Sequence, residues 1–157
     1  NSEQINSWIE KYPGSEGSLK VNVEMADKLG FKSSGVSDKE LTIDVNNFLD
    51  KLIEMDENTL SQIIETSPPL TIIAASFVVY GLYKRYQKKE ISKKQFISMS
   101  AKITGIKAAK IVMLLSLLAL PGIGQVVAVY LIASLMFSAI GIFEVKKEKL
   151  LLPAPTK

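Results

Sequence analysis

The chain has 157 residues, no cysteine, no histidine and a net charge of +3 at neutral pH. This composition excludes disulfides, thiol catalysis, thiolate zinc sites and imidazole acid–base chemistry. The net charge hides a division: residues 1–67 hold 13 acids and 6 bases, and residues 68–157 hold 3 acids and 13 bases. Such asymmetry indicates a surface for nucleic acid or anionic lipid. We favour lipid, because the basic part is also the more apolar one.

The first 67 residues predict a small, acidic, amphipathic helical part. In residues 2–12, Ile5, Trp8 and Ile9 share one face of a short helix, which Pro13 ends. Trp8 is interpreted as a core aromatic residue, with an interfacial anchor as the alternative. Residues 15–37 predict a loop with one helical turn over 23–29.

Two further helices are expected before residue 67. Ser37 and Glu40 match the N-cap and N3 positions of a capping box, and apolar residues follow at helical spacing up to Ile53. A shorter helix is expected from Asn58 or Thr59 to Glu65. The acids on the exposed face are interpreted as solvated, and neither a metal site nor a catalytic pair is predicted.

Residues 68–86 are a candidate membrane span. Thr66–Tyr83 carries no charge over 18 residues, which is close to the length a span requires. Three tyrosines and two bases at its end are typical of an interfacial belt: Tyr80, Tyr83, Tyr86, Lys84 and Arg85. The alternative is a buried core helix in a helical bundle.

The segment from residue 84 to residue 110 is strongly basic. We interpret its bases by the positive-inside rule, and nucleic-acid binding is judged unlikely because aromatic residues are sparse among them. A basic helix is predicted over 92–110, beginning at a capping box of Ser92 and Gln95. Small residues at a spacing of four, Ala101, Gly105 and Ala109, predict close helix packing.

Residues 111–143 form an uncharged run of 33 positions. As one helix it would be roughly 50 Å long, whereas a bilayer core is about 30 Å thick. Pro121, Gly122 and Gly124 near its middle favour a turn. The run therefore predicts a hydrophobic helical hairpin. Ala128, Ser134 and Ser138 are expected to pack against neighbouring helices.

Bases flank the hairpin on both sides, so both flanks are predicted to face the cytoplasm. The expected membrane-surface bases are Lys84, Arg85, Lys88, Lys89, Lys93, Lys94, Lys107, Lys110, Lys146 and Lys147. Residues 150–157 are expected to form a flexible tail.

In composition, residues 111–143 resemble the hydrophobic hairpin of colicin-type pore-forming domains. The matching features are the uncharged stretch, the central turn at 121–124 and the lysines at both ends. The resemblance implies a helical, toxin-like domain that forms a pore in a bilayer.

The sequence thus predicts an all-α protein with an acidic helical soluble part at 1–67 and a membrane-associated part at 68–149. No nucleophile–base pair, phosphate loop or metal spacing is present, so we predict a non-enzymatic membrane protein without a cofactor. It would oligomerise or form a pore through its hairpin, with the bilayer, anionic headgroups and further copies as partners. Two alternatives stay open. One is an accessory subunit of a membrane complex whose acidic part docks a partner, and the other is a soluble bundle that inserts only when triggered.

Overall fold

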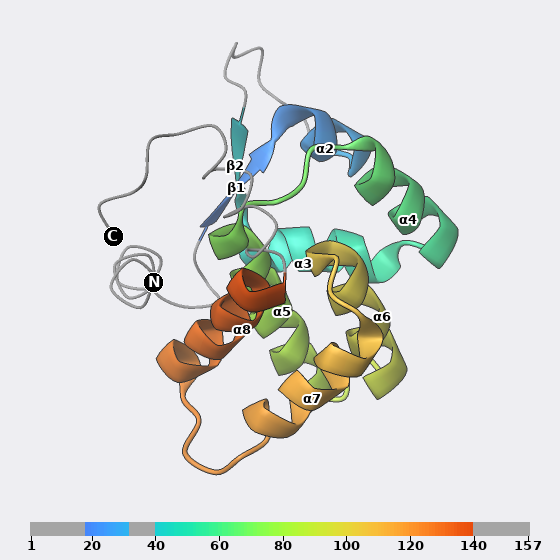
Figure 1. Cartoon of the computed structure of the whole chain (residues 1–157). Helices are drawn as coiled ribbons and strands as arrows, with labels where there is room; N and C mark the ends of the chain where they lie inside the picture. Colours follow the sequence, from blue (N-terminus) through green and yellow to red (C-terminus); the bar gives the residue numbers. More distant parts are fainter. Residues whose placement is uncertain (1–17, 32–39, 140–157) are drawn as a thin grey trace, which may run out of the picture.

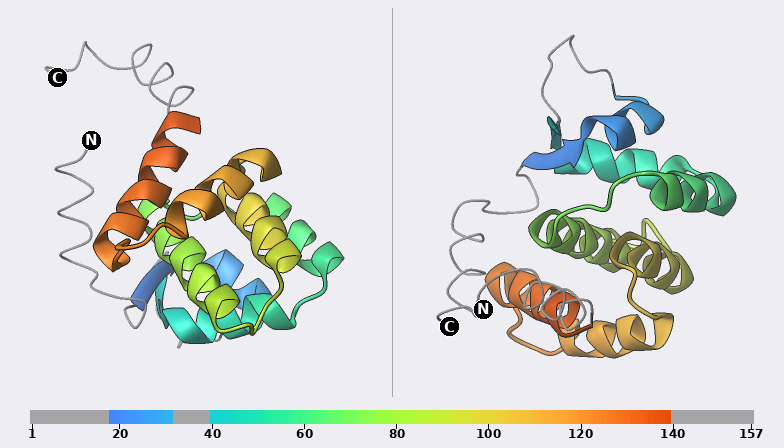
Figure 2. Two further views of the ribbon diagram at one scale, coloured as in Figure 1. Left: turned by 90° about the horizontal axis from the view of Figure 1, so that it is seen from below. Right: turned by 45° about the horizontal axis from the view of Figure 1, so that its top comes forward.

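The structure is a computed structural model and describes residues 18–31 and 40–139. Within these residues, seven helices and two strands are arranged in three layers (Figures 1 and 2). In chain order they are β1 (Ser18–Asn22), α2 (Val23–Lys28), β2 (Glu40–Asp44), α3 (Val45–Glu54), α4 (Glu57–Thr66), α5 (Ile72–Gln87), α6 (Lys93–Thr104), α7 (Ala108–Leu118) and α8 (Gln125–Ala139).

The layers follow the order of the chain, as the right-hand view of Figure 2 shows. The two strands, α2, α3 and α4 form the first layer, α5 and α6 form the middle layer, and α7 and α8 form the third. Packing contacts join α3 to α5, α5 to α8 and α6 to α7, so the middle layer is covered on both sides. One continuous apolar core runs through all three layers.

The strands β1 and β2 pair antiparallel, with Leu19 opposite Ile43 and Val21 opposite Leu41. The prediction of an all-α protein is therefore correct only in its mostly helical content. The helix expected directly after Ser37 begins later, because Glu40 lies in β2 and α3 starts at Val45 with Asp44 as its N-cap. The Asp44 Oδ1 accepts a hydrogen bond of 3.1 Å from the backbone N–H of Asn47.

The helices α3 and α4 bury the apolar faces that the sequence predicts. Phe48, Leu49 and Leu52 of α3 are almost fully buried, as is Leu60 of α4. The N-cap of α4 is Asp56, whose Oδ1 accepts a hydrogen bond of 2.7 Å from the backbone N–H of Thr59. Hydrogen bonds from the Thr59 backbone and side chain lower the pKa of Asp56 below 3.8.

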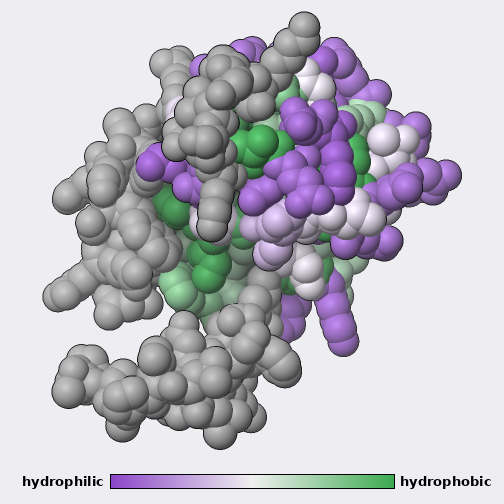
Figure 3. Space-filling model, turned by 90° about the horizontal axis from the view of Figure 1, so that it is seen from above, coloured by the Kyte–Doolittle hydropathy of each residue, from purple (hydrophilic) through white to green (hydrophobic). Residues whose placement is uncertain are grey.

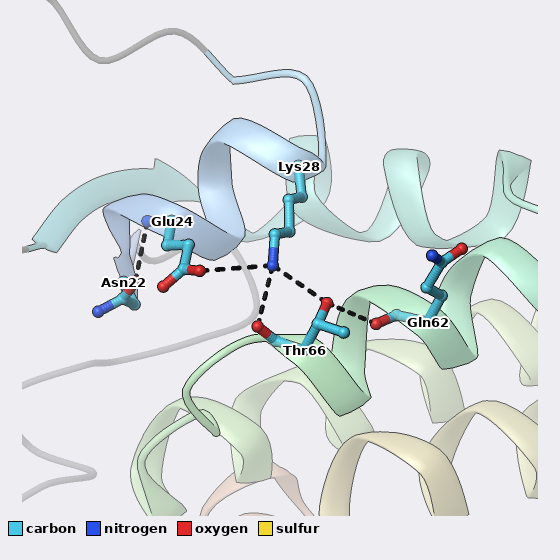
Figure 4. A network of polar contacts seen from close by, with 5 residues as sticks. All are labelled: Asn22, Glu24, Lys28, Gln62 and Thr66. Carbon is cyan, nitrogen blue, oxygen red and sulfur yellow. Dashed lines mark hydrogen bonds and ion pairs between the residues drawn. The ribbon is translucent and has the colours of Figure 1, made fainter.

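A polar network ties α2 to the end of α4 (Figure 4). The ammonium of Lys28 donates to the carbonyl and to the hydroxyl of Thr66, at 2.9 and 3.0 Å, and lies 3.5 Å from a Glu24 carboxylate oxygen. The Thr66 hydroxyl itself donates to the carbonyl of Gln62. Since a helix C-terminus has unpaired carbonyls, a lysine there stabilises the end of α4. Hydrophilic side chains gather on this side of the molecule, on the right in Figure 3.

The central helix is α5, in which all ten residues from Ala74 to Tyr83 are buried. A helix that is apolar on every side must be surrounded, and here the surrounding material is the two outer layers. Thr71 caps its N-terminus, and the Thr71 hydroxyl accepts a hydrogen bond of 3.2 Å from the backbone N–H of Ala74.

The predicted membrane spans are wrong. Among residues 18–31 and 40–139, none of the helices is both apolar and long enough to cross a bilayer. The candidate span at 68–86 is the 16-residue core helix α5. The run at 111–143 contains most of α7 and all of α8, which have 11 and 15 residues and pack against the middle layer. The membrane-protein and pore-forming interpretation and the multi-pass or hairpin-inserted location are therefore overturned.

The capping box at the start of α6 is confirmed. The Ser92 hydroxyl accepts from the backbone N–H of Gln95, and the Gln95 side chain accepts from the backbone N–H of Ser92. The single basic helix expected over 92–110 is instead two helices. Gly105, in a left-handed conformation with φ +74°, ends α6, and α7 begins at Ala108.

Several predictions lie outside the described residues. They are the helix at 2–12 with Trp8, the basic residues Lys146 and Lys147, and the tail at 150–157.

Candidate interaction surface

The connection between α7 and α8 lies at the lower end of the molecule in Figure 1, opposite the strands. Leu118 is the last residue of α7 and Gln125 is the first of α8. The predicted turn residues Pro121, Gly122 and Gly124 all lie exposed in this connection. Gly122 has a φ of +82°, which side-chain-bearing residues rarely adopt. The proline and glycines therefore divide the uncharged run into two antiparallel helices.

Each helix of this hairpin presents an apolar stripe to the middle layer. In α7 the stripe comprises Ile111, Leu114, Leu115 and Leu118, and in α8 it comprises Ala128, Val129, Ile132, Ala133 and Met136. These positions recur every three or four residues, as expected for one buried helix face. The two stripes hold the hairpin on α5 and α6.

Two polar contacts help to position the hairpin on α5. The Tyr83 hydroxyl donates a hydrogen bond of 3.0 Å to the Leu118 carbonyl, at the end of α7 where carbonyls lack helical partners. The same hydroxyl accepts from the Gln87 amide at 3.1 Å. Burial raises the pKa of Tyr83, so it stays protonated and able to donate at neutral pH. Near the other end of α5, the buried Ser76 hydroxyl lies 3.8 Å from the Met136 sulfur.

The hairpin leaves six large apolar side chains exposed, which we together call the hairpin face: Val112, Met113, Leu117, Leu120, Val126 and Val127. Met113, Val126 and Leu120 are the most exposed, at 58, 56 and 52%. The other three are between 41 and 45% exposed. Several large apolar side chains exposed within one short segment indicate an interaction surface, whereas single exposed apolar residues need no explanation.

The hairpin face carries no charge, since the chain has no charged residue from 111 to 139. The nearest bases along the chain, Lys107 and Lys110, lie exposed at the other end of α7. Lys88, Lys89, Lys93 and Lys94 are also exposed, and Lys84 is half-buried. The structure therefore does not gather the predicted membrane-surface bases around the hairpin turn.

Arg85 joins two layers. Its Nη1 lies 2.9 Å from the Asp50 carboxylate on α3 and 3.5 Å from that of Glu90, after α5. Its side chain is only 16% exposed. An acid from the predicted soluble part and a base from the predicted membrane-associated part thus form an ion pair.

The predicted helix-packing residues are divided between the core and the surface. Ala128 is buried and Ala101 and Ser134 are half-buried, whereas Gly105, Ala109 and Ser138 are exposed. None of the hairpin-face residues is among the site residues predicted from the sequence. The sequence shows that α7 is apolar on both faces, but it does not show which of the two faces the fold leaves exposed.

The described residues contain no group of three or more acidic side chains placed to hold a metal ion. Comparison with protein-family models, with curated proteins and with solved structures found no match for this chain. Its function must therefore be inferred from the surfaces of the molecule.

Proposed function

We propose that this chain is a non-enzymatic helical module that pairs with a second copy of itself through the hairpin face. The observation that carries the proposal is the group of six exposed apolar side chains within a segment free of charge. Exposing these side chains to water is unfavourable, and a partner surface that covers them removes that cost.

A second copy is the favoured partner because an uncharged apolar surface is complementary to itself. In a dimer with twofold symmetry, the same patch is used by both copies, so no matching set of charges is needed. Two antiparallel hairpins packed face to face form a four-helix arrangement, a common way to bury helix faces.

A lipid surface fits the hairpin face less well. Helices that lie in a membrane interface combine an apolar face with lysine or arginine and with bulky aromatic anchors. Here Lys107 and Lys110 lie at the start of α7, about 15 Å along the helix from the turn. The exposed apolar residues are valine, leucine and methionine.

The expected affinity follows from the exposed fractions, which add up to about three complete side chains per copy. Full burial of one such side chain contributes about 1.5–3 kcal/mol, so six in a dimer contribute roughly 9–18 kcal/mol. Association itself costs about 4–15 kcal/mol. The midpoints of these two ranges leave about 4 kcal/mol for association, which corresponds to a dissociation constant on the order of millimolar.

Sedimentation velocity over a range of concentrations tests the proposal. The wild-type chain should pass from monomer to dimer as its concentration rises toward the millimolar range. The double variant M113K+L120K places two charges in the hairpin face at exposed positions, so it should fold normally and remain monomeric. The matched control N58K+Q62K adds the same charge to exposed positions of α4 and should still dimerise.

Two outcomes contradict the proposal. One is a wild-type chain that stays monomeric at all accessible concentrations. The other is a dimer that M113K+L120K leaves intact. Flotation with liposomes, run in parallel, reports whether the hairpin face binds lipid in place of a second copy.

A further inference from the structure

A second surface, independent of the hairpin face, lies between α6 and the start of α7. It is an open groove of about 620 Å³, which we call the lysine groove. Its floor is formed by Ile97, Ala101 and Ala108, and Lys93, Lys94 and Lys102 line it. Ala101 and Ala108 have short side chains that leave the space between the two helices open.

Lys93 and Lys94 occupy positions at which a positive charge is electrostatically unfavourable. They occupy the first turn of α6, which contains no acid. The N-terminal turn of a helix carries partial positive charge and favours acidic residues, so two lysines there reduce the stability of α6. Residues that break a local rule without a local gain are expected at functional sites.

The lysines of the groove have few acidic neighbours. Lys102 lies 4.0 Å from Glu57, whose carboxylate also accepts a hydrogen bond of 3.1 Å from the Ser98 hydroxyl. Within the described residues, neither Lys93 nor Lys94 has a carboxylate within ion-pair distance. Lys107 and Lys110, both exposed, add positive charge on either side of Ala108.

We infer that the lysine groove docks an acidic amphipathic helix of a partner protein. The apolar floor accepts the partner's apolar side chains at helical spacing, as in other helix-in-groove complexes. The lysines pair with acids on the sides of that helix and set its orientation. A compact polar ligand fits less well, because the floor is almost entirely apolar and polar groups do not converge on one point.

Fluorescence anisotropy with a designed probe tests this inference. The probe is a fluorescein-labelled peptide of about 18 residues, long enough to form a helix, with leucines on one face and glutamates on the other. A matched peptide carries glutamines in place of the glutamates. The wild-type chain should bind the glutamate peptide about tenfold more tightly than the glutamine peptide, because only the former pairs with the lysines.

Two variants locate the binding site. K93E+K94E should weaken binding of the glutamate peptide at least tenfold. Ala108→Asp, which places a charge on the apolar floor, should weaken it as well. Both variants put acids in the first turn of a helix, where they favour folding, so lost binding cannot be ascribed to unfolding. The matched control K88E+K89E makes the same charge change outside the groove and should bind like the wild type.

Each contrary result overturns the inference. If the glutamate and glutamine peptides bind equally well, the lysines do not contribute to recognition through charge. If K88E+K89E weakens peptide binding as much as K93E+K94E does, the effect reports the net charge of the protein and not the groove. Weakening by M113K+L120K places the peptide on the hairpin face. Vesicles of phosphatidylglycerol that bind the wild type but not K93E+K94E, with no peptide binding, would assign the groove to lipid.

Discussion

At Gly81, α5 packs against Leu49 of α3, and replacement of this glycine by alanine tests how the layers pack. A Cβ at this position would lie 2.5 Å from the Leu49 Cδ1 atom. Ordinary contacts between carbon atoms are about 3.5–4.0 Å long, so the two helices or the Leu49 side chain must move by roughly 1 Å. Leu49 is only 1% exposed and lies within the core, so it has little room to do so.

The sign of the effect distinguishes this glycine from an exposed one. Within an exposed helix, Gly→Ala stabilises by about 1 kcal/mol. Forcing an extra methyl group into a packed core costs about 1–3 kcal/mol. We therefore expect Gly81→Ala to lower the free energy of unfolding by about 1 kcal/mol, which corresponds to roughly 2–4 °C in Tm.

A double-mutant cycle isolates the contact. Leu49→Ala removes the obstructing atoms and alone should cost about 2–5 kcal/mol. On that background Gly81→Ala should become stabilising by about 1 kcal/mol, because the helix preference remains and the clash does not. The coupling energy should therefore be about 1–3 kcal/mol.

Urea denaturation followed by far-ultraviolet circular dichroism measures all four proteins. If Gly81→Ala stabilises the wild type as much as it stabilises the Leu49→Ala variant, then α3 and α5 do not meet at this point. The packing of the first layer on the middle layer would then be wrong.

Three further predictions concern single positions. Gly122→Ala should lower the free energy of unfolding by about 1 kcal/mol because of the positive φ at this position. Gly124→Ala in the same connection should be nearly neutral, and thermal unfolding of the two variants measures the difference. The pKa of Asp56 is lowered in the folded state, so the ionised carboxylate stabilises the fold above pH 3.8 and this effect is lost as the pH falls below that value. Asp56→Asn removes the titrating group. In this variant the urea midpoint should therefore depend less on pH between about 5 and 3. Tyr83→Phe leaves the Leu118 carbonyl without its partner and should cost about 1–2 kcal/mol. The pKa of Tyr83 is raised in the folded state, so the wild type should also lose stability above pH 10 to a greater extent than this variant.

Local signals in the sequence determined several helix ends. The capping box of Ser92 and Gln95 starts α6, and the residues around Pro121 and Gly122 separate α7 from α8. These signals work because an unpaired backbone N–H and a positive φ are problems that particular residues solve within a few positions. The apolar face of α3 was also readable, although its start was not. The box suggested by Ser37 and Glu40 competed with strand pairing to β1, which is a contact between distant residues.

Only the tertiary structure decided what the uncharged segments are buried in. The hydropathy of the sequence indicates that α5 is buried away from water. A helix surrounded by protein and one surrounded by lipid show the same pattern of apolar residues, so hydropathy does not tell them apart. The 16 residues of α5 are enclosed because layers pack on both of its sides. The same reasoning applies to α7, whose two faces are both apolar. The sequence does not distinguish them, and the fold covers Leu114 while it leaves Met113 exposed, because only one face has a neighbouring layer.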